Sequence, residues 1–428
     1  MTCKCKSADG FYGWVNLGVM FIFNIASMSV MMTFSYFLPS WVEEFVWSRG
    51  IISGAQTVNM ILMGLAAPLA GILIMKTGAK KAIVLGNFIN LAGLLLLAYM
   101  SDIWQLYMGY GVIIGFGLSI GGMLGTMTVL NNWFVMKRTL ALSLSGASMG
   151  LSGIFFMPAL MALIQHIGWR NTYLIIAVAV LICCIIVPGL FLVNAPADLG
   201  QVPDGPVKPR TDEKKQMDTS HLYRTPVDFT VKEAMRTRTL WLLVAYNTLQ
   251  MLAMGGLMTH QIAFLYDIGI SPGWAALAGG IMSGVMSGSQ LVVGVMGLRI
   301  NIHSMAVGSM LLTIAGMTIL LFTKNFTMVV IYCILFGTGF GIQGIALGTL
   351  FPNYFGIKEF PKIMGYMMPF STLVGSLGAP ATGFIRDSMG SYVPAFQLSL
   401  VMLILAFFCI FFARPPIHPS LKEGQGAI

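Results

Sequence analysis

Charge is what this sequence lacks most. Only 9% of its 428 residues are Asp, Glu, Lys or Arg, against about 25% in soluble globular chains. Hydrophobic residues make up 57%. So little charge excludes a soluble enzyme, a disordered scaffold and a nucleic-acid binder. We therefore expect a non-enzymatic protein with no catalytic residues, no cofactor and no nucleic-acid partner.

Cysteine is also scarce, and its spacing fits neither a disulfide framework nor a metal site. Four of the six cysteines lie inside apolar segments, and Cys3 and Cys5 lie in a short polar N-terminal stretch. We expect no bound metal. The N-terminal stretch has no cleavable-signal pattern, so the first apolar run is expected to remain as a helix.

Long apolar runs are what the sequence does contain. A helix that spans a bilayer needs roughly 20 mostly apolar residues, and a segment in lipid must satisfy its own backbone hydrogen bonds. The sequence therefore predicts an all-α polytopic membrane protein with 12 transmembrane helices. The predicted spans are 12–38, 51–75, 82–100, 104–131, 139–165, 171–193, 239–266, 273–298, 302–323, 327–350, 362–385 and 391–412.

The long polar stretch at 194–238 divides these spans into six and six. We expect an N-terminal six-helix bundle over 1–193, a cytoplasmic linker over 194–238, and a C-terminal six-helix bundle with a short cytoplasmic tail over 239–428. If both termini are cytoplasmic, 20 of the 24 Lys and Arg residues lie on the cytoplasmic side. This asymmetry predicts that orientation in the plasma membrane. No charged residue then lies near the membrane centre.

The two halves repeat each other. Gly115–Gly122 in the fourth span resembles Gly337–Gly344 in the tenth, and Asn132-Trp133-Phe134 answers Asn353-Tyr354-Phe355. The matches keep an offset of 221 to 222 residues. Two parallel six-span repeats are the architecture of major facilitator carriers, which bind substrate between the halves.

Two motifs resemble the monocarboxylate porter family. The first span opens with Asp9-Gly10-Phe11-Tyr12-Gly13-Trp14, in which Asp9, Gly10, Gly13 and Trp14 match that family's first signature. The fifth span begins with Trp133-Phe134-Val-Met-Lys137-Arg138, which resembles the second signature. The end of the seventh span resembles bacterial members, including the oxalate/formate antiporter-like branch. The resemblance implies a transporter of small organic acids.

The sequence also departs from this family. The facilitator loop motif places an Asp in each half, but here Met75 and Leu298 stand at those positions. Where lactate carriers place a carboxylate-binding Arg in the eighth span, this chain has Gln290. An amide gives only neutral hydrogen bonds, whereas Arg offers a charged bidentate fork. We expect an inner gate with a weak ionic latch, formed by Lys76, Lys137, Arg138 and Arg299.

The resemblance and the polar residues inside the spans together predict a substrate site in the C-terminal half. Its predicted members are His260, Gln290, Tyr332, Tyr366 and Asn247, each of which has interhelical hydrogen bonding as its structural alternative. The leading hypothesis is rocker-switch transport of a monocarboxylate-like acid, with a proton as candidate co-substrate. The alternatives are a neutral, zwitterionic or apolar substrate, or a non-transporting receptor. We expect a monomer that contacts membrane lipids.

Overall fold

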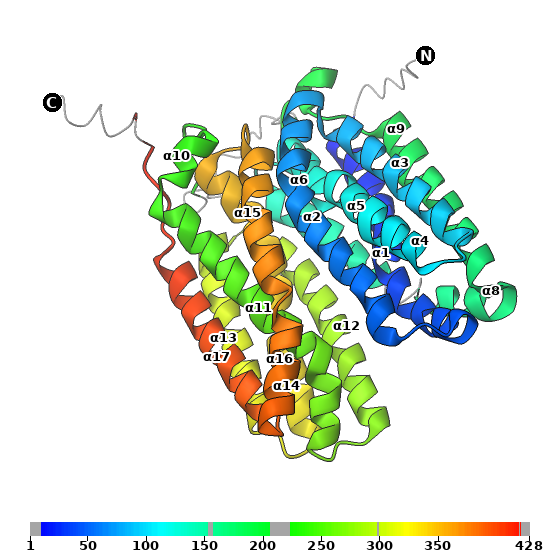
Figure 1. Cartoon of the computed structure of the whole chain (residues 1–428). Coiled ribbons are helices and arrows are strands. Elements are labelled where there is room, and N and C mark those ends of the chain that lie inside the picture. Colours follow the sequence, from blue (N-terminus) through cyan, green and yellow to red (C-terminus); the bar gives the residue numbers. More distant parts are fainter. Residues whose placement is uncertain (1–9, 153–156, 206–222, 298, 419, 421–428) are drawn as a thin grey trace.

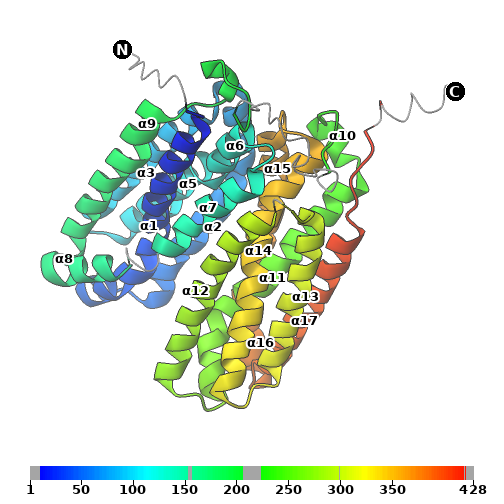
Figure 2. The same cartoon turned by 180° about the vertical axis from the view of Figure 1, so that it is seen from behind.

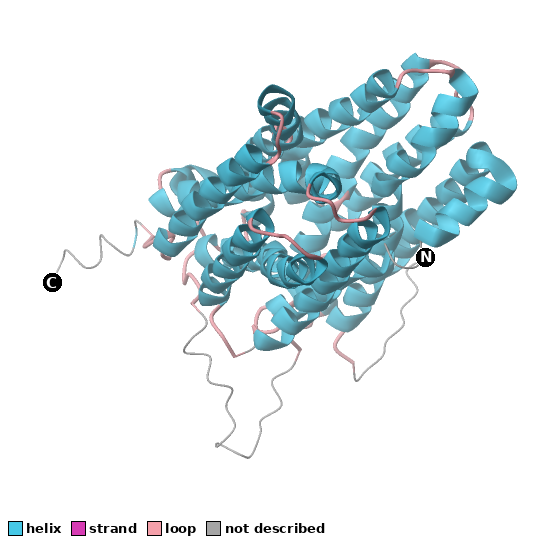
Figure 3. Cartoon of the chain, turned by 90° about the horizontal axis from the view of Figure 1, so that it is seen from below, coloured by secondary structure: helices cyan, strands magenta, loops and turns pink. Residues whose placement is uncertain are grey.

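The computed structural model consists of helices arranged as two groups side by side (Figure 1). It describes residues 10–152, 157–205, 223–297, 299–418 and 420, and these residues contain no strand (Figure 3). The all-helical prediction is confirmed. We call the end of the molecule where α1 begins and α10 lies the linker end; α17 also ends there (Figures 1 and 2).

The first group contains the helices that precede the linker. These are α1 Gly13–Phe45, α2 Arg49–Thr77, α3 Ala79–Ala98, α4 Ile103–Leu106, the π-helical η1 Tyr107–Ile114, α5 Gly115–Gly121, α6 Met123–Trp133, α7 Arg138–Leu151, α8 Met157–Val180, the π-helical η3 Leu181–Ile186, and α9 Val187–Phe191.

The second group follows two short linker helices, which are η4 Pro196–Leu199 and α10 Val231–Met235. Its helices are α11 Arg238–Asp267, α12 Pro272–Met296, α13 Ile302–Leu321, α14 Phe326–Phe355, α15 Phe360–Gly375, α16 Gly378–Met389 and α17 Val393–Phe412. Within the described residues, nine helical segments are individually long and apolar enough to cross a membrane. The other three predicted spans correspond to α1, to α7 with the start of α8, and to α15 with α16.

Polar caps and backbone breaks set several helix boundaries. The side chains of Ser48 and Asn325 accept hydrogen bonds from backbone N–H groups at the starts of α2 and α14, which satisfies first-turn donors. Gly168 has φ +79°, in the left-handed region that favours glycine. The helical backbone of α8 is broken at this residue, and the break separates the fifth predicted span from the sixth. The fourth span breaks at Gly122, between α5 and α6. Its repeat counterpart in α14 is continuous.

The two groups contact each other mainly through α2 with α15 and α7 with α12. A Cβ on Gly71 would lie 2.5 Å from the Pro361 carbonyl oxygen, and one on Gly365 would lie 2.7 Å from that of Ala67. Only glycine permits this approach of α2 to α15. These contacts join the last three turns of α2 to the first two turns of α15. The two groups of helices diverge toward the end opposite the linker end (Figures 1 and 2).

Candidate functional site

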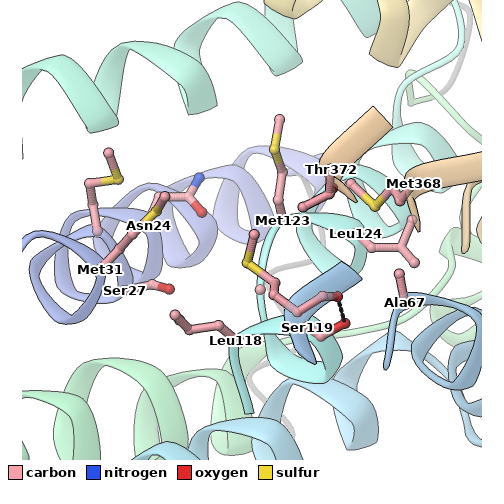
Figure 4. A pocket seen from close by; sticks show the side chains of 13 residues that line it. Asn24, Ser27, Met31, Ala67, Leu118, Ser119, Met123, Leu124, Met368 and Thr372 are labelled. Carbon is pink, nitrogen blue, oxygen red and sulfur yellow. Dashed lines mark hydrogen bonds between the residues drawn. The ribbon is translucent and has the colours of Figure 1, made fainter. Parts of the chain in front are cut away.

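A cavity of about 210 Å³ lies between the two groups of helices, close to the middle of α1. Its wall contains side chains of both groups, because Met368 and Thr372 belong to α15 (Figure 4). We call it the central cavity. Its lining residues are Asn24, Ser27, Met28, Met31, Met63, Ala67, Leu118, Ser119, Gly122, Met123, Leu124, Met368 and Thr372.

The central cavity contains no ionisable side chain among its lining residues. Five of its 13 lining residues are methionines, whose thioethers are polarisable groups on flexible chains that adapt to varied apolar shapes. Hydroxyl groups come from Ser27, Ser119 and Thr372, and the Ser119 hydroxyl donates to the Met63 carbonyl oxygen at 2.9 Å (Figure 4). The cavity is therefore apolar with a few neutral polar groups.

A smaller cavity of about 70 Å³ adjoins the central cavity, and Asn24 and Met123 line both. Gln290 on α12 lines this smaller cavity opposite α7. A Cβ placed on Gly146 would lie 2.6 Å from the Gln290 side-chain oxygen, so the amide lies directly against α7. That oxygen is buried and has no hydrogen-bond partner among the described residues.

Asn24 is the polar centre of the wall that the two cavities share. Its amide nitrogen donates to the Ser145 hydroxyl at 2.7 Å, and its oxygen accepts from the Thr126 hydroxyl at 3.3 Å. These bonds tie α1 to α6 and α7 and fix the orientation of the amide. The sequence did not single out Asn24, because nothing in it distinguishes an amide that faces a cavity from one that joins helices.

The break at Gly122 brings two helix ends to the central cavity. Gly122 has φ −96° and ψ −135° and lines the cavity, so α5 ends and α6 begins there. The first turn of a helix has N–H groups without intrahelical partners and carries the positive end of the helix dipole. Half-helix N-termini of this kind face anionic substrate groups in several secondary transporters.

The structure places the five predicted substrate residues apart from one another. Of these five residues, only Gln290 lines a cavity described above, and it lines the smaller one. His260 contacts α16, with its Nε2 atom 3.0 Å from the Ala379 carbonyl oxygen. The Tyr332 hydroxyl is buried in the second group and donates to Gln261 at 2.8 Å. Asn247 is half-buried on α11, and Tyr366 lies at the linker end beside α10.

Arg138 closes the linker end between the two groups. This residue is 2% exposed, and its guanidinium donates to the Asn353 side-chain oxygen of α14 at 2.5 Å. Nearby, the Asn131 amide donates to the Gly348 carbonyl oxygen at 3.4 Å. The predicted gate residues Lys76 and Arg299 are exposed, also at the linker end. The Arg138 contact across the interface thus pairs a cation with a neutral amide.

Two linker residues bind the segment directly before α7. The Asp204 carboxylate accepts from the backbone N–H groups of Val135, Met136 and Lys137 at 2.6 to 3.1 Å, directly before α7. Arg224 donates to the Val135 carbonyl oxygen at 2.7 Å. Burial lowers the pKa of Arg224, although the Asp204 carboxylate acts in the opposite direction. Sequence reasoning missed both residues because their partners are 67 to 89 residues away.

The two signature motifs pack against each other at the linker end. The Phe11 ring lies 5.7 Å from the Trp133 ring, and the Trp14 ring lies 5.2 Å from that of Phe134. The Lys137 ammonium lies 5.7 Å from the Trp14 ring centroid. Gly10 begins the described chain, and Asp9 lies outside the described residues.

Comparison with family models identifies the architecture. The model of the Major Facilitator Superfamily matches residues 19–378, and it matches again over 249–427. The chain belongs to the Major Facilitator Superfamily. It is therefore a membrane transporter protein by family and not an enzyme.

Curated relatives of this superfamily member are monocarboxylate transporters. Monocarboxylate transporter 4 of Rattus norvegicus is 23% identical over 95% of this chain and 85% of its own length. Monocarboxylate transporter 13 of Bos taurus is 23% identical over 98% and 95%. Monocarboxylate transporter 11 of Homo sapiens is 24% identical over 96% and 85%. These matches confirm the predicted family resemblance.

Solved structures of the superfamily share the fold. The transporter FucP, in its outward conformation, has a TM-score of 0.73 at 17% identity, covering 95% of this chain and 100% of FucP. The proton:xylose symporter XylE has a TM-score of 0.71 at 10% identity, covering 94% of this chain and 96% of XylE. The predicted 12-helix facilitator fold is confirmed.

Proposed function

We propose that this facilitator is a secondary transporter that moves a small organic acid across the plasma membrane by rocker-switch alternating access. The central cavity carries the proposal, because both groups of helices line it and its lining contains no ionisable side chain. The moving bodies are residues 1–193 and 239–428, joined by a cytoplasmic linker at 194–238. The transporter works as a monomer with both termini cytoplasmic.

The closed linker end supports an assignment of the conformational state. Arg138 and the α2–α15 glycine contacts join the halves at that end. The linker also contacts both halves there, through Arg224 to Val135 and through the Thr225 backbone N–H to the Asn353 carbonyl oxygen. With cytoplasmic termini, this state is closed to the cytoplasm and faces outward. FucP, whose structure is in the outward conformation, has a similar arrangement of helices.

The chargeless lining determines the form in which an acid binds. A carboxylate buried without a full counter-charge loses several kcal/mol of hydration free energy, and the start of α6 at Gly122 offers only a partial positive charge. We therefore propose that the acid binds with its proton, which makes the proton the co-substrate. The Asn24 and Gln290 amides and the Thr372 hydroxyl offer neutral hydrogen bonds, and the methionines contact the apolar part.

A neutral small molecule is the second candidate substrate, and the same lining favours it. A thermal-shift comparison of matched acids and their amides separates the two candidates, because a ligand that binds only the folded state raises Tm. If a protonated acid is the ligand, its stabilisation falls as pH rises, since the protonated fraction drops about tenfold per pH unit above the carboxyl pKa. Stabilisation by amides alone, independent of pH, contradicts the organic-acid proposal.

A further inference from the structure

A groove of about 560 Å³ lies at the linker end, between α10 and the start of α15. It is separate from the central cavity, and Figure 1 shows α10 beside the upper ends of α11 and α15. We call it the α10–α15 groove. It is lined by Thr230, Val231, Lys232, Met235, Arg236, Glu359, Lys362 and Tyr366.

The α10–α15 groove has excess positive charge. Three of its lining residues are cations, Lys232, Arg236 and Lys362, against the single acid Glu359. The Glu359 carboxylate already accepts from the Val231 backbone N–H at 2.8 Å. The ion pairs found among the described residues involve other basic groups, so none of the three cations has an acidic partner within that part of the chain.

An apolar aromatic surface lies next to this charged groove. Trp241 of α11 is 43% exposed, and its indole N–H donates to the Met235 carbonyl oxygen at 2.8 Å, which anchors the ring to the end of α10. Phe370 of α15 is 48% exposed, and its ring lies 6.0 Å from the Trp241 ring. Trp residues of membrane proteins are enriched at the headgroup level, where an apolar ring and a polar N–H are both accommodated.

We propose that the α10–α15 groove binds an anionic phospholipid. Lys232, Arg236 and Lys362 hold the headgroup phosphate, and an acyl chain lies against Trp241 and Phe370. Lys362 and Tyr366 are four residues apart on α15 and share one helix face, so the Tyr366 hydroxyl also faces the headgroup. A basic pocket beside an exposed aromatic pair fits an amphiphile, whereas a free phosphate uses only the basic part.

Native mass spectrometry of the purified full-length protein tests this site with defined lipids. Phosphatidylglycerol is titrated against phosphatidylcholine with the same acyl chains. The groove variant carries Lys232→Gln, Arg236→Gln and Lys362→Gln. The control variant loses three exposed cations elsewhere at the linker end through Lys76→Gln, Lys81→Gln and Arg299→Gln.

Each cation near an anionic headgroup contributes about fivefold in affinity, so the loss of three is expected to weaken phosphatidylglycerol binding about 100-fold in the groove variant. The control variant keeps wild-type preference, and phosphatidylcholine binding is unchanged in both. Equal loss in the two variants, or no preference for phosphatidylglycerol in the wild type, contradicts the proposal.

A second measurement separates lipid from free phosphate. Inorganic phosphate and glycerol 3-phosphate are added to the phosphatidylglycerol complex, and we expect no displacement at concentrations equal to that of the lipid. Displacement at equal concentration assigns the groove to a soluble phosphate and contradicts the lipid. If the groove variant does not fold, the single changes Lys362→Gln and Trp241→Ala are each expected to weaken phosphatidylglycerol binding about fivefold, and unchanged binding in both contradicts the site.

Discussion

At the residue scale, the linker end contains a buried guanidinium, Arg138, that forms no ion pair with a carboxylate among the described residues, although the Asp204 carboxylate acts on it through space. The family motif supplies acidic residues at this end, but here Met75 occupies the first position, and Leu298, at the second, lies outside the described residues. Arg138 instead donates to the neutral Asn353 amide. The cross-half bond is thus a charge-assisted hydrogen bond to a neutral amide and not an ion pair, so we expect opening of this contact to require no separation of opposite charges.

Arg138→Gln is expected to shift the protein away from the closed linker end. A hydrogen bond to a charged group contributes about 1.5–3 kcal/mol, so we expect a change of about 10- to 150-fold in the ratio of the two access states. The measurement is the labelling rate of a cysteine placed at Ser143, which lies between α7 and α12. Lys81→Gln, at an exposed cation of α3 outside the predicted gate, serves as control. An unchanged rate in Arg138→Gln contradicts this role.

Gln290→Arg is expected to reverse the preference of the site between neutral and anionic ligands. The substitution places an Arg, as in the lactate carriers, beside the wall that the two cavities share. Burial of its charge raises the free energy of the site unless a carboxylate neutralises it. Ligand-induced Tm shifts for an acid and its amide above pH 7 provide the measurement. His260→Gln is the control, because that ring contacts α16 and lines neither cavity. If ligand preference is unchanged, Gln290 is not at the site.

Residue partners were the hardest features to predict from sequence. The basic residues Lys137 and Arg138 stand out in the second signature, but Asn353 is 215 positions from Arg138. Asp204 is one of several linker acids, and only the folded chain places it before α7. Such pairings arise from the packing of the two groups of helices and of the linker between them, and no local sequence pattern predicts them.

At the element scale, helix spans were predictable because bilayer thickness sets their length and polar residues set their ends. The seventh span was predicted at 239–266, and α11 runs over Arg238–Asp267. Which face of each helix lines the cavity was not predictable. Lipid-facing and interior-facing surfaces are both apolar, so five methionines out of 33 line the central cavity without a distinguishing pattern.

The α2–α15 contact gives a prediction about elements. Gly71→Val places a branched side chain where the Pro361 carbonyl oxygen lies 2.5 Å from an added Cβ. Overpacking of this kind costs about 1–3 kcal/mol, and it acts only in the state in which α2 and α15 touch. We expect increased accessibility of the cavity from the linker end, measured by cysteine labelling at Ser27.

Gly308→Val is the matched control, since an added Cβ at Gly308 meets nothing within 4 Å. It adds the same side chain to a helix without affecting the interface. Equal labelling of Ser27→Cys in the Gly71→Val and Gly308→Val backgrounds would show that the glycine contact does not set the access state.

At the scale of the whole molecule, the distribution of basic residues predicts orientation. Lys358 lies at the linker end, and Lys324 precedes α14 at the opposite end. In a cysteine-free background, Lys324→Cys is expected to react with an impermeant maleimide in intact cells. Lys358→Cys is expected to react only after permeabilisation. The reverse pattern would place both termini outside.

The central claim is that the two halves alternate around a chargeless cavity that carries an acid together with its proton. Flux of a labelled monocarboxylic acid into proteoliposomes, driven by an inward proton gradient, tests it most directly. Protein-free liposomes measure passive leak.

Ser27→Trp fills the central cavity, and Leu311→Trp adds the same indole at an exposed position on α13. The account predicts gradient-dependent uptake by the wild type and Leu311→Trp, and uptake at the leak rate for Ser27→Trp. Equal uptake by the two Trp variants, or no uptake above leak by the wild type for any acid or amide tested, would contradict it.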